Sequence, residues 1–257
     1  MLNLNKLEKT VEKEIEIYDN SCQIAAMNGD LDSLKYAHTH SCPWDEMTCY
    51  YASKNGHLEC LKYLYDQGCP WDEMTCIYAA MNGHLECLKF AHKNNCPWNK
   101  QVCNFAALNG HLEILIYAVE NECPWDETTC YYAACSKLEC LEYVRSHECP
   151  WDGRTCAYAA MNGKLDCLKF AYKNNCPWDE TTCHYAVMNG HLDCLKYLHE
   201  NGCPWDERTY EIAVENGNLE CVEYLYEKEC SWNKDKCLKI AFKERNITIF
   251  NYISDCM

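Results

Sequence analysis

Cysteine is the residue type in this chain that offers the most chemistry, because a thiol can form a disulfide, bind a metal ion or act as a nucleophile. There are 24 cysteines among the 257 residues. All of them except Cys135 and Cys256 recur at three positions of a repeated pattern. Eight precede Pro or Ser, eight open a predicted helix, and six lie in the helix that follows it.

The regular spacing of these cysteines argues against a disulfide scaffold. Equivalent positions in stacked repeats would lie about 10 Å apart, whereas a disulfide needs Cα atoms within about 7 Å of each other. The spacing leaves open pairs between different classes of cysteine. A free cysteine packs as a small apolar side chain, so we interpret the cysteines as core residues. A redox or metal-responsive protein built on these thiols is the alternative.

The histidines do not form a recognisable metal site. His57-x-x-Cys60 recurs as His84-x-x-Cys87 and again at His191, but strong zinc spacings close four ligands through paired Cys-x2–4-Cys motifs. The sequence contains no such pair of motifs. We therefore predict no metal ligand and no cofactor.

Pairs of adjacent carboxylates stand at the start of several predicted helices. Acid–base catalysis needs two carboxyl groups whose environments push their pKa values apart, and adjacent exposed residues do not provide this. We interpret the pairs as helix caps that also favour the helix dipole; the alternative is an acidic strip that steers a basic partner. Without a Gly-rich phosphate loop or a Ser/His/Asp set, we expect no enzyme. The pairs begin at Asp45, Asp72, Asp126, Asp179 and Asp206.

An internal repeat sets the positions of all these residues. The tryptophans follow one another at intervals of 27 residues, with a single interval of 26. Each one ends a Cys-Pro-Trp tripeptide, except the last, which ends Cys-Ser-Trp. The tryptophans are Trp44, Trp71, Trp98, Trp125, Trp151, Trp178, Trp205 and Trp232.

Each repeat is typical of two short helices. In the repeat that begins at Cys69, Asp72 is placed to cap a first helix (helix A) over about residues 73–81, and Asn82-Gly83 would end it. A second helix (helix B) would start near His84. Helices of about ten residues are not stable alone, so each pair must pack against the next one, as in a solenoid.

The segment GHLECLKYLYDQGC, from Gly56 to Cys69, resembles the ankyrin repeat. The resemblance covers about residues 21–253. It implies an all-α, ankyrin-like solenoid of stacked helix-turn-helix repeats, in which helix A lines the concave side where partners usually bind. It also implies that the histidine after the glycine bonds to the backbone between the helices. Similar segments begin at Gly83, Gly110, Gly163, Gly190 and Gly217.

These repeats depart from the usual ankyrin length. Ankyrin units normally have about 33 residues and include a β-hairpin, whereas these have 27. We therefore expect hairpins shortened to turns and almost no strand. The Cys-Pro-Trp-Asp form is similar to ankyrin-repeat proteins of giant DNA viruses of amoebae (mimivirus-like), which implies the host cytoplasm.

The repeats predict a single solenoid over residues 1–257. Residues 1–41 would form an N-terminal leader and capping unit, 42–236 the tandem 27-residue repeats, and 237–257 a C-terminal capping unit. One repeat lacks a residue and its glycine, so we expect a kink or a 3₁₀-like turn at residues 135–137.

The net charge of the chain limits which classes of partner it can bind. Its 39 Asp and Glu against 23 Lys and Arg give a net charge of −16, which disfavours nucleic acid and anionic membranes and favours a partner protein with a basic surface. No apolar run approaches the roughly 18 residues of a membrane helix, and the first 20 residues do not resemble a secretory signal. We therefore expect a cytoplasmic protein.

The residues that vary between repeats indicate where a partner would bind. Three, six and ten residues after each tryptophan (offsets 3, 6 and 10), the residue type changes from repeat to repeat, and these offsets share one helical face. Offsets 7 to 9 repeat Tyr-Ala-Ala, which is typical of a buried seam; drift of exposed positions is the alternative explanation for the variable face. The predicted partner-binding residues are Met47, Tyr50, Lys54, Met74, Ile77, Met81, Gln101, Asn104, Leu108, Thr128, Tyr131, Arg154, Met161, Thr181, His184, Met188, Arg208 and Glu211.

A non-enzymatic scaffold that binds a protein partner on the helix-A face, as a monomer, is the function that these features favour. A substrate-recruiting adaptor in host ubiquitin or signalling pathways is an alternative. It would need a recruiting motif, and residues 1–20 and 237–257 are too short for an F-box.

Overall fold

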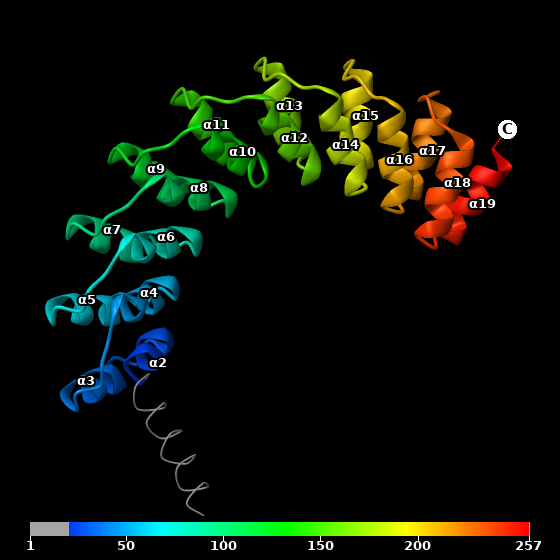
Figure 1. The fold of residues 1–257 in the computed structure, drawn as a ribbon. Helices are drawn as coiled ribbons and strands as arrows, with labels where there is room; N and C mark the ends of the chain where they lie inside the picture. Colours follow the sequence, from blue (N-terminus) through cyan, green and yellow to red (C-terminus); the bar gives the residue numbers. More distant parts are fainter. Residues whose placement is uncertain (1–20, 257) are drawn as a thin grey trace, which may run out of the picture. The chain divides into compact units, whose positions relative to one another are not determined.

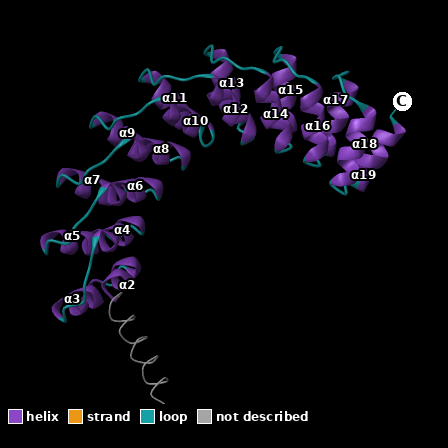
Figure 2. Ribbon diagram, viewed as in Figure 1, coloured by secondary structure: helices purple, strands orange, loops and turns teal. Residues whose placement is uncertain are grey.

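The computed structural model describes residues 21–256 and contains 18 helices over that range, with no strand (Figures 1 and 2). The prediction of an all-α fold with turns in place of hairpins is confirmed. The expected N-terminal leader, residues 1–20, lies outside the described residues.

The chain divides into two compact units, and the first ends at Trp125. In it, helices A and B alternate along the chain. Its helices are α2 (Ser21–Asn28), α3 (Leu31–Thr39), α4 (Glu46–Lys54), α5 (Leu58–Asp66), α6 (Glu73–Met81), α7 (Leu85–Lys93), α8 (Lys100–Leu108) and α9 (Leu112–Glu120).

The second unit begins at Asp126 and continues the same alternation. Its helices are α10 (Glu127–Ala134), α11 (Leu138–Ser146), α12 (Gly153–Met161), α13 (Leu165–Lys173), α14 (Glu180–Met188), α15 (Leu192–Glu200), α16 (Glu207–Glu215), α17 (Leu219–Glu227), α18 (Lys234–Lys243) and α19 (Ile247–Asp255).

Each unit has two layers of helices. The even-numbered helices are helices A and pack on one another in chain order, as in α4 with α6 and α12 with α14. The odd-numbered helices are helices B and form the other layer, as in α5 with α7. Each helix A also packs on the helix B that follows it. This nearest-neighbour stacking is the solenoid that the period predicts.

Helix A begins and ends where the sequence predicts. Asp72 precedes α6, and its side chain accepts a hydrogen bond from the Met74 amide at 2.9 Å. Asn82 follows the helix, and Gly83 has φ +82°, a conformation that glycine adopts without a Cβ clash. The interpretation of the Asp residues as caps is confirmed here.

Glycine is also required at these turns because the next repeat packs on it. A Cβ at Gly29 would lie 2.4 Å from the ring of His57. The same ring donates from Nε2 to the carbonyl of Met27 at 3.1 Å, and His111 donates likewise to Met81 at 3.2 Å. The expected role of these histidines as backbone donors is confirmed.

The shortened repeat has a different turn. Helix α10 ends at Ala134, and no described residue of the turn that follows has positive φ. The Cys135 amide donates to Tyr132 and the Ser136 amide to Ala133, at 3.2 and 3.0 Å. The Cys135 amide also donates to Tyr131 at 3.1 Å, which is an α-helical bond, and the Ser136 bond has its counterpart in full-length repeats, as from Gly110 to Ala107. The predicted kink or 3₁₀-like turn therefore stays a prediction.

A tryptophan takes the place of the hairpin between repeats. The Trp98 ring stacks on His92 with 3.7 Å between centroids, and the edge of Tyr117 approaches both rings. His92 Nδ1 and the Tyr117 hydroxyl are hydrogen-bonded at 2.9 Å. Ring pairs of this kind add about 0.5–1.5 kcal/mol beyond buried area. The same arrangement, with one stacked pair and a third ring edge-on, occurs at His38–Trp44–Tyr63, Tyr65–Trp71–Phe90, Tyr172–Trp178–Tyr197 and His199–Trp205–Tyr224.

All 24 cysteines are free, and all except Cys135 are buried. The thiol before Pro bonds back to the residue that caps the preceding helix A. Cys96 donates to the carbonyl of Asp72 at 3.2 Å, and Cys176 donates to that of Asp152 at 3.2 Å. The hydrogen bond to Cys96 and burial raise the pKa of Cys76 far above its usual range. Apart from Cys135, the cysteines are therefore core side chains, as predicted.

Candidate protein-binding face

The helix-A face is the part of the even-numbered helices that helix B does not cover. Residues three positions after the tryptophan lie on it, as predicted. Met47 and Met74 are 40% and 36% exposed, and Gln101 and Arg154 are also exposed. Large apolar side chains that remain open to solvent in this way are common at protein interfaces.

The residues at offset 6 contradict the prediction that this position belongs to the exposed partner-binding face. Ile77 is 1% exposed and Glu211 2%, and Tyr50, Asn104 and Ala157 are also buried. These side chains point between neighbouring even helices: the rings of Tyr50 in α4 and Tyr78 in α6 lie 4.5 Å apart. Offset 6 follows offset 3 by three residues, so its side chain is rotated by about 60° around the helix axis, and the neighbouring even helix covers it. Tyr131 and His184 are half-buried.

Offset 10 lies at the end of each even helix and is partly open. Lys54, Met81, Leu108, Met161 and Met188 are half-buried. Methionine has a flexible and polarisable side chain that adapts to different partners, so these residues suit a contact surface.

The tyrosines at offset 7 belong to the face, which the sequence reasoning missed. The pattern Tyr-Ala-Ala predicted a buried seam, and the two small residues that follow each tyrosine are indeed buried, as in Ala79 and Ala80. The tyrosine itself is half-buried at Tyr51, Tyr78 and Tyr158. The signal that could have found it is residue size, because after every tryptophan except the last, offset 7 holds large side chains whereas offsets 8 and 9 hold only alanine, serine or valine.

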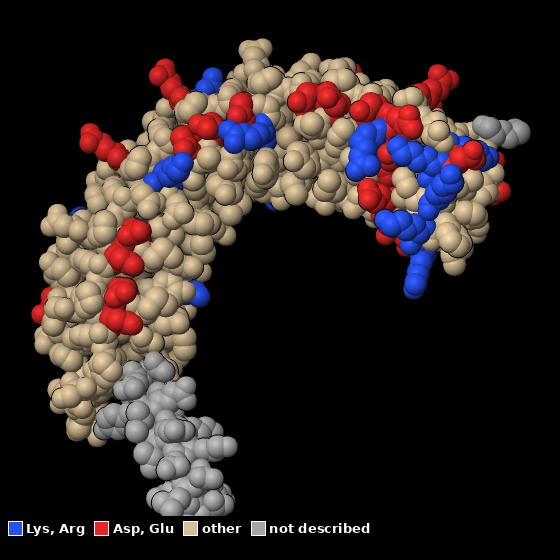
Figure 3. Space-filling view, in the orientation of Figure 1, with Lys and Arg blue, Asp and Glu red and all other residues tan. Residues whose placement is uncertain are grey.

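In the first unit the tyrosines form a cluster with one cation. The Tyr50 and Tyr51 rings lie 4.7 Å apart, and Lys54 Nζ lies 5.5 and 5.7 Å from the ring centroids of Tyr50 and Tyr78. Lys54 also donates to the Tyr50 hydroxyl at 3.2 Å, which raises the pKa of Lys54. Figure 3 shows acidic side chains over the starts of α4 and α6 and a single basic one near their other end.

The second unit has its own row of tyrosines, and this row carries an arginine. Tyr131 stacks on Tyr158 at 4.9 Å, and Tyr158 lies 6.2 Å from Tyr185. The Arg154 guanidinium lies 5.4 Å from the Tyr131 ring and pairs with Asp152 at 2.7 Å. The hydrogen bond from Arg154 lowers the pKa of Asp152. Arginine stacked on an aromatic ring is a frequent anchor at interfaces.

Further along the second unit the face becomes charged. Glu211 is buried and pairs with Lys236 and, at 3.4 Å, with Arg208. His184 Nε2 lies 2.9 Å from Asp206 Oδ1. Although partial burial opposes it, the hydrogen bond from His184 lowers the pKa of Asp206. The two units therefore offer different chemistry on equivalent helices.

The described residues contain no group of three or more His, Cys, Asp or Glu side chains that could hold a metal ion. Over the same range, each helix is too short to span a bilayer. Of the large apolar side chains that are exposed, Met47 and Met74 lie on the helix-A face.

Comparison with protein-family models agrees with this architecture. Family models for ankyrin repeats match residues 22–91 and 156–239 (three-copy model) and 76–119 (many-copy model). The solved human ASB11 ankyrin repeat domain is similar at 17% identity and a TM-score of 0.46, with 80% of this chain and 96% of that one covered. A search of curated proteins gave no match. The family models cover more than half of the chain, so the protein belongs to the ankyrin-repeat family.

Proposed function

We propose that this protein is a non-enzymatic scaffold that binds a protein partner through its helix-A face. Ankyrin repeats generally mediate protein–protein interaction. The observation that carries the proposal is the half-exposed row of tyrosines flanked by exposed methionines on the even helices. Tyrosine and methionine are enriched at interfaces because they bury much apolar area and adapt their shape.

The partner is a protein with a basic surface, and the scaffold binds it as a monomer. A net charge of −16 attracts basic proteins over a distance of about a Debye length and repels further copies of the chain. The similarity of the Cys-Pro-Trp-Asp repeats to those of giant viruses of amoebae supports binding in the host cytoplasm.

Site-specific photo-crosslinking tests the proposed face. A photo-reactive amino acid replaces Met74 on the helix-A face in one variant and Lys89 on α7 in a matched control. We expect partner adducts from position 74 in host-cell lysate and few from position 89. Adducts that map instead to Lys35, Lys62, Lys89 and Lys196 on the helices B would place the binding surface on the opposite layer and refute the proposed face.

Affinity measurements then test the residues. Once the partner is captured, Tyr78→Ala and Met74→Ala should each weaken binding by roughly tenfold, because truncating a buried interface anchor typically costs more than about 1 kcal/mol. Tyr36→Ala on α3, where the ring is 64% exposed, is the matched control and should leave the dissociation constant unchanged.

A further inference from the structure

The last helix pair, α18 and α19, exposes positions that every earlier described repeat buries. Four residues before the helix-B cap, the earlier repeats carry a small side chain that is at most 5% exposed. In the last repeat the cap is Asn246, and the corresponding residue is Phe242, which is 76% exposed. The buried residues are Ala26, Ser53, Ala80, Ala107, Ala133, Ala160, Val187 and Val214.

The same contrast occurs four residues after the cap. The earlier repeats place a leucine or valine there, and each one is fully buried. In the last repeat the residue is Phe250, which is half-buried. The buried residues are Leu34, Leu61, Leu88, Leu115, Leu141, Leu168, Leu195 and Val222.

The reason for the difference is that these positions face the next helix pair. In α4, for example, the Ser53 hydroxyl donates to the carbonyl of Thr75 in α6 at 2.7 Å. No described residue covers the corresponding face of α18 and α19. This face carries Phe242, Phe250 and Ile247, of which Ile247 is 74% exposed.

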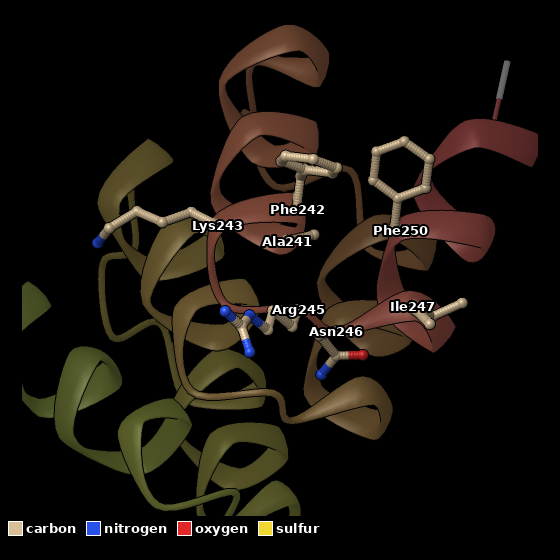
Figure 4. A pocket seen from close by; sticks show the side chains of 7 residues that line it. All are labelled: Ala241, Phe242, Lys243, Arg245, Asn246, Ile247 and Phe250. Atoms are coloured by element: carbon tan, nitrogen blue, oxygen red, sulfur yellow. The ribbon is translucent and has the colours of Figure 1, made fainter.

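These side chains line a groove of about 590 Å³. Figure 4 shows Phe242 on α18 and Phe250 on α19 projecting on the same side, with a gap between their rings. Lys243 and Arg245 lie at the end of the groove where α18 turns into α19. The groove is therefore apolar in its centre and basic at one end.

The surroundings of the groove are basic in an otherwise acidic chain. Residues 228–245 contain six Lys and Arg against three Asp and Glu, a net charge of +3 in a chain of −16. Two of these lysines are already paired, Lys236 with Glu211 and Lys243 with Glu244 at 3.0 Å. Both charged residues that line the groove, Lys243 and Arg245, are basic. Figure 3 shows blue side chains, with red ones among them, over this end of the second unit. An apolar groove with a basic rim complements an amphipathic helix whose polar face is acidic.

We propose that the groove of α18 and α19 docks an acidic amphipathic helix from another protein. Apolar side chains spaced three and four residues apart would fill the gap between Phe242 and Phe250, and acidic side chains beside them would pair with Lys243 and Arg245. A symmetric dimer through this end is disfavoured, because it would bring the basic rims of two copies together. This surface is separate from the tyrosine-bearing face, so either proposal can fail without the other.

Fluorescence anisotropy with designed peptides tests the proposal. The probe is a labelled peptide of about four helical turns, with Leu at i, i+3, i+4 and i+7 and Glu and Ala elsewhere. We expect saturable binding to the full chain at micromolar concentration. A peptide with Lys in place of each Glu should bind at least tenfold more weakly. Absence of saturation by the acidic peptide, or equal binding of the two peptides, would overturn the proposal.

Variants locate the binding. Phe242→Ser should weaken binding of the acidic peptide at least tenfold, and Lys243→Glu with Arg245→Glu should weaken it several-fold and remove its salt dependence. All three substituted residues are exposed, and circular dichroism checks that the variants keep their helices. Tyr36→Ser is the control at an equally open apolar residue of α3. If the chain instead self-associates in sedimentation velocity, and Phe242→Ser abolishes that association, the occupant is a second copy and the proposal is wrong.

Discussion

The charge state of two histidines that stack on tryptophan affects the stability of the folded protein. Burial lowers the pKa of His92 and of His199. The folded protein therefore favours the neutral ring. The resulting stability is complete above the unfolded-state pKa of about 6.5, and it is lost as the pH falls from there through the lower pKa of the folded state.

This linkage predicts a measurable pH effect. The chain supplies the control, because Tyr172 occupies the same position and stacks on Trp178 at 3.8 Å. His92→Tyr combined with His199→Tyr should reduce the fall of the urea midpoint between about pH 7.5 and about pH 5.5. An equal fall in the wild type and the double variant would show that these rings are not the titrating groups.

Cys135 differs from the other thiols because it is half-buried. Burial raises the pKa of Cys135 to about 11, and only the thiolate reacts. We expect the native protein to react slowly with an aromatic disulfide reagent at one thiol near pH 8, and at all 24 cysteines after unfolding. Cys135→Ala should abolish the native reaction.

The thiol measurement also tests the redox alternative. The buried cysteines pack in the core, out of reach of solvent, so their reaction should require unfolding. Rapid reaction of several thiols in the folded protein, with no dependence on denaturant, would contradict the core interpretation and favour a redox role.

At the scale of helices and turns, two glycines separate a backbone effect from a packing effect. Gly56 and Gly68 have φ of +75° and +78°. A Cβ at Gly56 would lie 2.5 Å from His84 of the next repeat, whereas nothing lies within 4 Å of a Cβ at Gly68. Substitution at both sites strains the backbone, but at Gly56 it also disturbs the contact between repeats.

Alanine at these sites therefore has unequal effects. Gly68→Ala should lower the free energy of unfolding by about 1–2 kcal/mol, and Gly56→Ala by more, as measured by urea denaturation. His84→Ala in the Gly56→Ala background should recover part of the difference, because it removes the clashing ring. If the two single variants are equally stable, the histidine moves aside without loss and the packing argument fails.

At the scale of the whole molecule, a stack of nearest neighbours should lose structure locally. Leu61 is fully buried in α5, which contacts α3, α4 and α7. Leu61→Ala should lower the free energy of unfolding by about 2–5 kcal/mol. We expect faster amide hydrogen exchange in α3 to α7 and unchanged exchange in α14 to α17, because the stability of a solenoid is a sum of local and neighbour terms.

The matched change lies in the second unit. Leu195 is the equivalent buried residue of α15. Leu195→Ala should give the reverse pattern, in which amide hydrogen exchange becomes faster around α15 and stays unchanged in α3 to α7. Uniform acceleration in either variant would show that the whole chain unfolds as one cooperative body.

The sequence by itself determined the elements and the repeat. Asp72, Asn82 and Gly83 act on backbone within a few residues of themselves, so the bounds of α6 followed from local chemistry. The 27-residue period required each pair to pack on the next pair. The burial of the cysteines also followed, because the same small residue type recurs at equivalent positions.

Only the tertiary structure decided which side chains face solvent. Ile77 and Tyr78 are adjacent, yet Ile77 is buried between α6 and its neighbours whereas Tyr78 is half-exposed. Likewise, Phe242 and Phe250 occupy positions that the repeat pattern marks as core. Exposure depends on how neighbouring helices pack and on whether a further pair covers them, and a periodic sequence specifies neither of these for a single residue.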